Sequence, residues 1–238
     1  MKKTSAAILC ALSFLLAGNA AMADALDEKS RSIIAISAYT AQGDMEKLDA
    51  SLVRGLEAGL TVNEIKEVLV QLYAYTSFPR SLNAILRFMD VTKRRADAGI
   101  KDEPGREPSP VPAGINKDEY GAKVRAKLGG RTEIPPPSGY QVFAPAIDTF
   151  LKEHLFCDIF IRDNLSPKHR ELATIGALGA MTGTAGQLNF HLGAALNTGT
   201  TTEEMQDYLA EIERAAGKEQ AEVAKGVLEK ILAKRKAS

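Results

Sequence analysis

The chain has 238 residues, and its 30 basic and 30 acidic side chains give a formal net charge of zero at pH 7. This balance provides no basic surface of the kind that binds nucleic acid or an anionic membrane, so we expect neither as a partner. The length is enough to bury one large hydrophobic core or two small ones.

The first 23 residues have the pattern of a secretory signal peptide. Two lysines precede an uncharged apolar run over residues 6–17, and the Ala-x-Ala pattern of a cleavage site follows at 21–23. The run is shorter than the roughly 20 residues that a membrane-spanning helix needs, and no later stretch is long and apolar enough. We therefore expect cleavage after Ala23, a soluble protein that is periplasmic or secreted, and no membrane insertion after cleavage.

Cys157 is the only cysteine that would remain after this cleavage. An internal disulfide therefore cannot form, although export into an oxidising compartment would permit one. We expect Cys157 to be a buried apolar side chain and not a nucleophile.

The first two helices are predicted from the spacing of small and apolar residues. Residues 26–42 contain few helix breakers, and a turn follows at Gly43. Three leucines then recur at helical spacing, and Gly59 is a typical residue at which such a helix ends.

A third and a fourth helix are predicted next, separated by a break. Thr61 and Glu64 have the spacing of a capping box and would begin a helix that runs to about residue 75. The break at residues 76–79 ends in Pro79, which suits the first turn of a helix over residues 80–95. These four helices form a first unit, residues 24–98.

Residues 99–140 differ from the rest of the chain because they contain most of its ten prolines. Segments of this composition bury little apolar surface, and only residues 118–128 are predicted to be helical. We interpret 99–140 as a proline-rich connector and residues 141–238 as a second unit.

The second unit begins with a predicted helix over residues 143–163 and then repeats the first unit. The order of helix, turn, helix, glycine stop and helix cap is the same in both. Identical residues at matching positions include Arg31 with Arg170, Gly59 with Gly199, Thr61 with Thr201 and Glu64 with Glu204. The sequence therefore predicts an internal duplication.

Motifs in both units point to one family. The second unit contains Arg170-Glu171-Leu172 and a step from Gln187 to His191, and the first contains Tyr75-Thr76-Ser77-Phe78-Pro79, followed two residues later by Leu82-Asn83-Ala84. These motifs resemble the carboxymuconolactone decarboxylase family, which includes the AhpD-like proteins and whose usual form of the last segment is Tyr-x-Gly-Phe-Pro-x-x-Leu-Asn-Ala. The resemblance covers about residues 26–90 and 150–232. It implies an all-α fold of two AhpD-like helical units related by pseudo-two-fold symmetry, and a homo-oligomer, most simply a trimer.

Glu171 and His191 are the residues that the resemblance places at an active site. A turn lies between them in the sequence, so two antiparallel helices can bring them to neighbouring levels. A carboxylate beside an imidazole fixes the tautomer of the ring and makes it a suitable proton acceptor. The alternative is a hydrogen-bonded pair that only satisfies two half-buried groups between helices.

Thr184 and Gln187 occupy the positions where redox members of the family carry a Cys-x-x-Cys pair. Without thiols there is no thiolate to reduce a peroxide, so we do not expect AhpD-type peroxidase activity. Gln187 lies four residues before His191 and should share its helix face, where the amide can bind either a substrate oxygen or the imidazole.

The first unit has serines, Ser32 and Ser51, at the two matching positions, and neither is a useful base by itself. It keeps polar residues around Pro79 that pseudo-symmetric packing can turn toward the histidine of the second unit: Tyr73, Tyr75, Arg80 and Asn83. Arg80 is a candidate clamp for a substrate carboxylate, or else a solvated arginine in the first turn of a helix. The two tyrosines are candidate acids, or else core residues with satisfied hydroxyls.

The other two histidines, His154 and His169, have charged neighbours and are predicted to lie at the surface or at a helix start. No set of His, Asp, Glu or Cys residues has the spacing of a metal site, and no glycine-rich phosphate loop occurs. We therefore expect neither a metal nor a cofactor.

These features favour a cofactor-independent lyase, a carboxy-lyase for example, or an isomerase that acts on a small-molecule carboxylate or lactone. His191 would transfer the proton, Glu171 would orient its ring, and Gln187 and Arg80 would hold substrate oxygens, with Tyr75 and Asn83 beside them. The alternative is a catalytically silent periplasmic helical oligomer that binds a small ligand or a partner protein. The loss of the site residues from one unit and of the thiols from the other favours that alternative.

Overall fold

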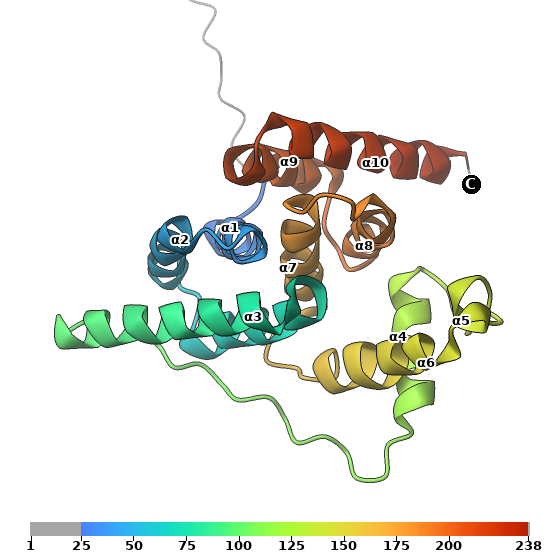
Figure 1. The fold of residues 1–238 in the computed structure, drawn as a ribbon, viewed down its shortest axis with the longest axis horizontal. Helices are drawn as coiled ribbons and strands as arrows, with labels where there is room; N and C mark the ends of the chain where they lie inside the picture. The colour runs from blue at the N-terminus through green and yellow to red at the C-terminus, as the bar shows by residue number, and fades with distance from the viewer. Residues whose placement is uncertain (1–24, 238) are drawn as a thin grey trace, which may run out of the picture.

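The computed structural model describes residues 25–237, and this part of the chain is helical, without a β-strand. The predicted signal peptide lies outside the described residues. In the first unit, α1 (Glu28–Gln42) and α2 (Met45–Glu57) pack side by side, and the long α3 (Val62–Asp97) lies against both (Figure 1). The all-α fold predicted from the sequence is confirmed.

Local sequence signals set the ends of these helices. The Asp27 side chain accepts a hydrogen bond from the Ser30 backbone N–H, and α1 ends at Gly43 in the left-handed conformation. The predicted capping box is present at the start of α3, where Thr61 and Glu64 accept hydrogen bonds from each other's backbone N–H groups.

The break predicted at residues 76–79 is a kink inside α3. Ser77 has φ 71° and ψ 159°, a conformation that is essentially restricted to glycine. The third and fourth predicted helices are therefore two arms of one element. Across the kink, the Ser81 hydroxyl donates a hydrogen bond to the Leu69 carbonyl at 2.7 Å.

The second unit repeats this arrangement with α7 (Pro167–Gly179), α8 (Ala185–Asn197), α9 (Thr202–Ala216) and α10 (Lys218–Lys236). Between α9 and α10 stands Gly217, with φ 92° and ψ 169°. By the spacing of the repeat, Gly217 matches Ser77, so the two arms of α3 correspond to α9 and α10.

The centre of the molecule is the crossing of α1 and α7. Gly176 of α7 lies so close to α1 that a Cβ atom there would be 2.9 Å from the Ile34 carbonyl oxygen. Buried apolar side chains from both units form one continuous core around this crossing. None of the helices in residues 25–237 has the length and apolar character needed to cross a membrane.

The connector contributes more packing than its composition predicts. Its helix α4 (Lys117–Leu128) packs against a π-helix, η1 (Leu151–Ile159), and Gly121 permits the contact, because a Cβ atom there would overlap the Lys152 carbonyl oxygen. Two short helices, α5 (Tyr140–Phe143) and α6 (Pro145–Phe150), precede η1. In Figure 1, α4, α5 and α6 form a group beside α8. A second apolar cluster, which includes Leu128 and Phe156, lies in this group.

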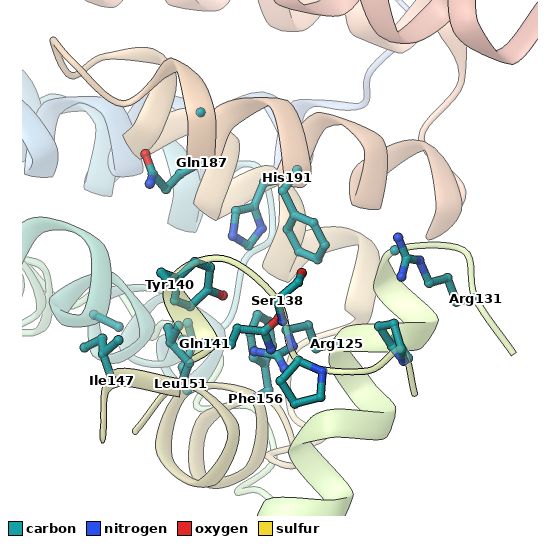
Figure 2. Close-up of a pocket in the computed structure, with 18 of the residues that line it drawn as sticks. Arg125, Arg131, Ser138, Tyr140, Gln141, Ile147, Leu151, Phe156, Gln187 and His191 are labelled. Atoms are coloured by element: carbon teal, nitrogen blue, oxygen red, sulfur yellow. The ribbon is translucent and has the colours of Figure 1, made fainter. Parts of the chain in front are cut away.

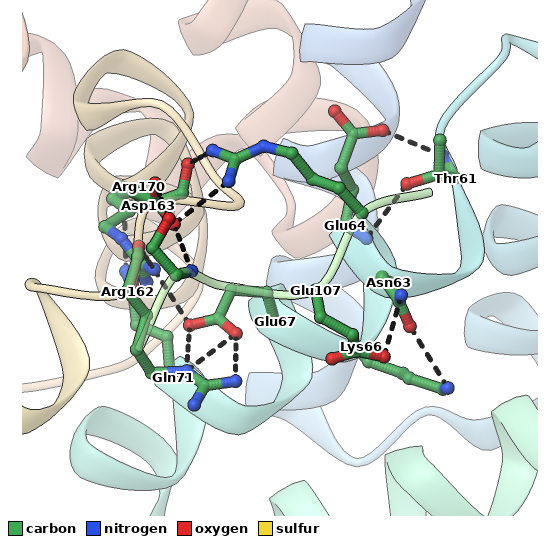
Figure 3. A network of polar contacts seen from close by, with 12 residues as sticks. Thr61, Asn63, Glu64, Lys66, Glu67, Gln71, Glu107, Arg162, Asp163 and Arg170 are labelled. Atoms are coloured by element: carbon green, nitrogen blue, oxygen red, sulfur yellow. Dashed lines mark hydrogen bonds and ion pairs between the residues drawn. The ribbon is translucent and has the colours of Figure 1, made fainter. Parts of the chain in front are cut away.

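A buried polar network joins α3 of the first unit to α7 of the second (Figure 3). Arg170 donates hydrogen bonds to Glu67 and to the Gln71 side-chain oxygen, both at 2.8 Å. Arg162 adds a bidentate contact to Glu67 at 2.9 Å. Burial alone would raise the pKa of Glu67, but the hydrogen bonds from the two arginines outweigh it, so the pKa lies below its ordinary value.

The matching arginine of the first unit makes the reciprocal contact. Arg31 of α1 pairs with Asp207 at 3.0 Å and with Glu211 at 3.1 Å, and both acids are on α9 of the second unit. Each unit therefore contributes one arginine that binds polar side chains of the other unit. This exchange is the arrangement expected of two copies related by pseudo-two-fold symmetry.

Candidate active site

A pocket of about 980 Å³ lies between α8 and the helices α4, α5, α6 and η1 (Figure 2). Helix α8 provides one wall, and α4, the segment after it, α5, α6 and η1 provide the others. The first unit contributes Ala74 and Tyr75 of α3. The pocket is therefore built from the second unit, the connector and the kinked end of the first arm of α3.

Glu171 and His191 come together because α7 and α8 form an antiparallel pair. Ser166 caps the start of α7 and Pro167 follows in its first turn, which places Glu171 one turn into the helix. Gly183, with φ 82°, lies in the turn before α8, and the Thr184 hydroxyl closes that turn by donating to the Leu178 carbonyl at 2.7 Å. His191 is two turns into α8.

The two side chains form a buried hydrogen-bonded pair. His191 Nδ1 lies 2.8 Å from Glu171 Oε2, and the residues are 5% and 0% exposed. The Glu171 carboxylate can accept a hydrogen bond from Nδ1–H of the ring, which leaves the Nε2 lone pair of a neutral imidazole free. Nε2 has no hydrogen-bond partner among the described residues, and Figure 2 shows the ring pointing into the pocket.

Tyr75 brings the first unit into contact with this pair. Its ring meets the His191 ring edge-on, with centroids 5.4 Å apart, and Phe190 meets the same ring at 5.1 Å. Burial, together with the charge of Glu171, raises the pKa of the Tyr75 hydroxyl, so the group stays protonated. Contacts with these two aromatic rings restrict the orientation of the imidazole.

Gln187 lines the pocket on the same face of α8 as His191 (Figure 2). It makes no hydrogen bond to the imidazole, whose partner in the described chain is Glu171. The sequence predicted that this amide binds either a substrate oxygen or the imidazole. Since it does not bind the imidazole here, it is available to a ligand.

Arg80 and Asn83 are not brought to this pocket. Both follow the kink at Ser77, both are exposed, and neither lines the cavity. The kink turns the second arm of α3 away from the second unit's histidine. Tyr73 also lies outside the pocket, stacked on Phe78 at 4.4 Å.

Two arginines that sequence reasoning missed line the pocket instead, Arg125 and Arg131. Arg125 is on α4, and Arg131 follows the Gly129-Gly130 end of that helix. They stand in the connector, which was predicted to bury little surface, so no local signal marked them. The predicted helix over residues 118–128 was the one feature of the sequence that could have drawn attention to this segment.

The two arginines differ in their surroundings. Arg125 donates to Asp148 at 2.6 Å, and Asp148 also accepts from Gln141 at 2.9 Å. Burial alone would raise the pKa of Asp148, but these hydrogen bonds outweigh it and the pKa is lowered. The Arg131 side chain makes no hydrogen bond or ion pair with any residue in 25–237. It is therefore available to a ligand.

The other two histidines and Cys157 do not line the pocket. His154 is exposed and contacts Asp158 at 3.0 Å, while His169 is near the start of α7, where burial lowers its pKa. Cys157 is fully buried, and burial raises the pKa of its thiol, which confirms the prediction of a buried side chain. Within residues 25–237 no cluster of three or more His, Cys, Asp or Glu side chains could hold a metal.

Comparison with known families agrees with the duplicated fold. The model of the carboxymuconolactone decarboxylase family matches residues 11–90 and again residues 145–230, which together are more than half of the chain. A comparison with curated proteins finds no match. The two matches fall on the two helical units, which fit two AhpD-like units. The chain therefore belongs to the carboxymuconolactone decarboxylase family, as a duplicated two-unit member.

Proposed function

We propose that the protein is a cofactor-independent lyase or isomerase that acts on a small carboxylate or lactone by proton transfer at His191. The observation that carries the proposal is the buried Glu171–His191 pair, which presents Nε2 to a pocket large enough for a substrate. Membership of the family supports the same class of chemistry.

In this proposal Nε2 of the neutral ring takes a proton from a carbon next to a carbonyl, or the protonated ring returns one to it. For a decarboxylation, the ring first takes up a proton from solvent at Nε2. Loss of carbon dioxide from a carboxylate β to the carbonyl leaves an enolate, which takes that proton and returns the ring to its neutral form. Glu171 is a positioning residue: it holds the ring in one tautomer and offsets the positive charge that forms on it.

Charge on the substrate oxygens needs partners inside the pocket. Gln187 can donate from its amide, and Arg125 and Arg131 can each bind a carboxylate through their guanidinium groups. These two arginines replace Arg80 in the proposal, because Arg80 is exposed outside the pocket.

The test is a screen of lactones and keto acids with wild-type protein, followed by the His191→Asn variant on any substrate that turns over. We expect kcat to fall about 10²–10⁴-fold, the usual contribution of a general acid or base. His154→Asn is the matched control, since it makes the same change at an exposed histidine outside the pocket, and it should retain activity. Unchanged turnover in His191→Asn would remove the proposed role. If no compound of either class is turned over, a silent binding protein becomes the better interpretation.

We also propose that the protein works in the periplasm or outside the cell, after cleavage at Ala23. The charged start, apolar run and small residues of positions 1–23 support this. Mass spectrometry of the protein recovered from a secreting bacterial host should give a mature chain that begins at Asp24. A chain that starts at Met1 in the cytoplasm would contradict it.

A homotrimer is the oligomer we propose. Support for an oligomer comes from an exposed apolar stripe on the second arm of α3, formed by Phe78, Leu82, Leu86 and Met89, and the number three is what the family resemblance implies. Monomeric soluble proteins rarely leave a contiguous apolar patch of this kind open to water. Light scattering on the purified protein should give three times the chain mass, and a monomer mass would contradict the proposal.

A further inference from the structure

The charged side chains that line the pocket have one sign, and the Glu171 carboxylate lies behind the lining, hydrogen-bonded to His191. Arg125 and Arg131 are the only charged groups among the residues that line it, apart from a His191 that has taken up a proton, and no Asp or Glu lines it. Asp148, behind the wall, is already bound by Arg125 and Gln141 and also lies 3.4 Å from Lys152. The pocket therefore favours an anionic ligand, and Arg131 is the cation without a partner in the described chain.

The rest of the lining is largely apolar. A run of three prolines, residues 135–137, covers one side. Aliphatic and aromatic side chains of α6, η1 and α8 cover another: Ile147, Leu151, Leu155, Phe156 and Phe190. Surfaces of this composition bind the apolar part of a ligand, while a few polar groups fix its orientation.

The size of the pocket adds a third observation. At about 980 Å³ it is near the top of the range of roughly 300–1,000 Å³ that is usual for small-molecule sites. A single lactone ring with one carboxylate would leave much of the apolar wall in contact with water.

The labelled side chains have an order across the pocket. In Figure 2, Arg131 stands at one edge and Gln187 at the other, with His191 between them, and Tyr140, Ile147 and Leu151 face α8 from the opposite wall. A ligand anchored at Arg131 would therefore extend past the imidazole and along an apolar surface.

We propose that the ligand of this pocket is a carboxylic acid with a large apolar body. The carboxylate pairs with Arg131, and the body lies against the wall formed by α6, η1 and Phe190. The inference deepens the proposed function, on which it rests for the reaction at His191, by naming the kind of substrate. Binding of an unreactive acid does not depend on that reaction.

Calorimetric titration with a series of ω-phenylalkanoic acids tests the apolar part. Phenylacetate, 4-phenylbutanoate and 6-phenylhexanoate differ only in methylene groups, and each methylene that becomes buried should strengthen binding about fourfold. We expect 6-phenylhexanoate to bind about tenfold or more tightly than 4-phenylbutanoate. Equal affinity across the series, or no binding of any member, would overturn the proposal.

The charged part is tested by comparing 6-phenylhexanoate with 6-phenylhexan-1-ol in wild-type protein and in Arg131→Gln. Loss of a charge-assisted contact should weaken the acid about tenfold to a hundredfold and leave the alcohol nearly unchanged. Arg54→Gln is the matched control, because Arg54 is an exposed arginine on α2 that does not line the pocket. Equal effects of the two substitutions on the acid would overturn the role of Arg131.

The two proposals fail in different ways. Turnover that survives His191→Asn removes the proposed reaction but leaves acid binding at Arg131 intact. Conversely, turnover of small polar lactones by a protein that binds none of the phenylalkanoic acids removes the present inference and leaves the reaction.

Discussion

Two matching positions of the duplicated fold carry different side chains. In the second unit they are Glu171 and His191, which form a hydrogen-bonded pair beside a pocket, and in the first unit they are Ser32 and Ser51. Both serines are buried, and the Ser32 hydroxyl has no hydrogen-bond partner in the described part of the chain. The first unit thus keeps the helices of the site without its acid and base.

The contacts around these positions differ as well. Tyr75 of the first unit lies against the second unit's histidine, whereas the residue that matches it by repeat spacing is Ala215. By contrast, the Arg31 and Arg170 contacts are present in both directions across the pseudo-two-fold axis. Both units therefore keep the helices and the arginine contacts between them, whereas only the second unit keeps the residues of the candidate site. Substitutions at matching positions can separate a role in the fold from a role in the site.

The largest expected effect is the loss of unfolding free energy when an acid partner of Arg170 or of Arg31 is removed. Glu67→Ala leaves Arg170 buried with two neutral partners, the Gln71 side chain and the Arg162 carbonyl, and loss of one member of a buried pair costs about 3–5 kcal/mol. Glu211→Ala should cost less, because Arg31 retains Asp207 at 3.0 Å. Urea unfolding followed by circular dichroism measures both. Equal losses of unfolding free energy would show that the two contacts are equivalent.

The pH dependence of stability sharpens the same contrast. The folded-state pKa of Glu67 is below the ordinary value of 4.5, so its contribution is present above about pH 4.5 and is lost as the pH falls through the folded-state pKa. The difference in unfolding free energy between wild type and Glu67→Gln should be constant above that pH and shrink below it. A difference that widens on acidification would contradict the assignment of a stabilising, ionised Glu67.

A smaller loss of stability is expected from a change in the packing of α4 against η1, which form part of the pocket beside the second unit's histidine. Gly121→Val places side-chain atoms where the Lys152 carbonyl oxygen lies and should push α4 away from η1. We expect a loss of about 1–3 kcal/mol, typical of overpacking, together with loss of phenylalkanoic acid binding. Gly226→Val, at a glycine of α10 with open space around it and outside the pocket, is the control. Unchanged acid binding in Gly121→Val would show that α4 does not shape the pocket.

The smallest effect is expected at the kink, where Ser77 and Gly217 have similar backbone angles. Ser77→Gly removes the strain of a side chain at positive φ and should stabilise the protein by about 1 kcal/mol. Ser77→Ala keeps a Cβ atom and should give no gain. Thermal unfolding of the two variants measures this difference in stability. Destabilisation by Ser77→Gly would mean that the serine backbone is not strained.

Local patterns predicted most of the fold. The capping box at Thr61, the glycine stop at Gly43 and the repeat spacing depend on residues close in sequence, and each has its expected place in the structure. The approach of Glu171 to His191 was also predictable, because a turn between two helices of known rise fixes their levels.

The rest of the pocket depends on packing between distant segments. Arg125 and Arg131 reach it because α4 docks on η1 through Gly121, a contact that no periodic pattern encodes. Arg80 and Asn83 were predicted to approach the histidine, but the direction of the second arm of α3 is set by the backbone angles at Ser77. Such angles cannot be read from residue type when the residue is not glycine.

Nitrogen NMR of the His191 imidazole is the most direct test of proton transfer at the second unit's site. The chain has three histidines, so ¹⁵N-histidine labelling with His154→Asn and His169→Asn variants assigns the signals. We predict that the neutral ring carries its proton on Nδ1 and leaves Nε2 bare, and that 6-phenylhexanoate shifts the Nε2 signal of His191 without affecting the other two histidines. A proton on Nε2 in the neutral ring, or an Nε2 signal that does not respond to the acid, would contradict a base that faces an occupied substrate pocket.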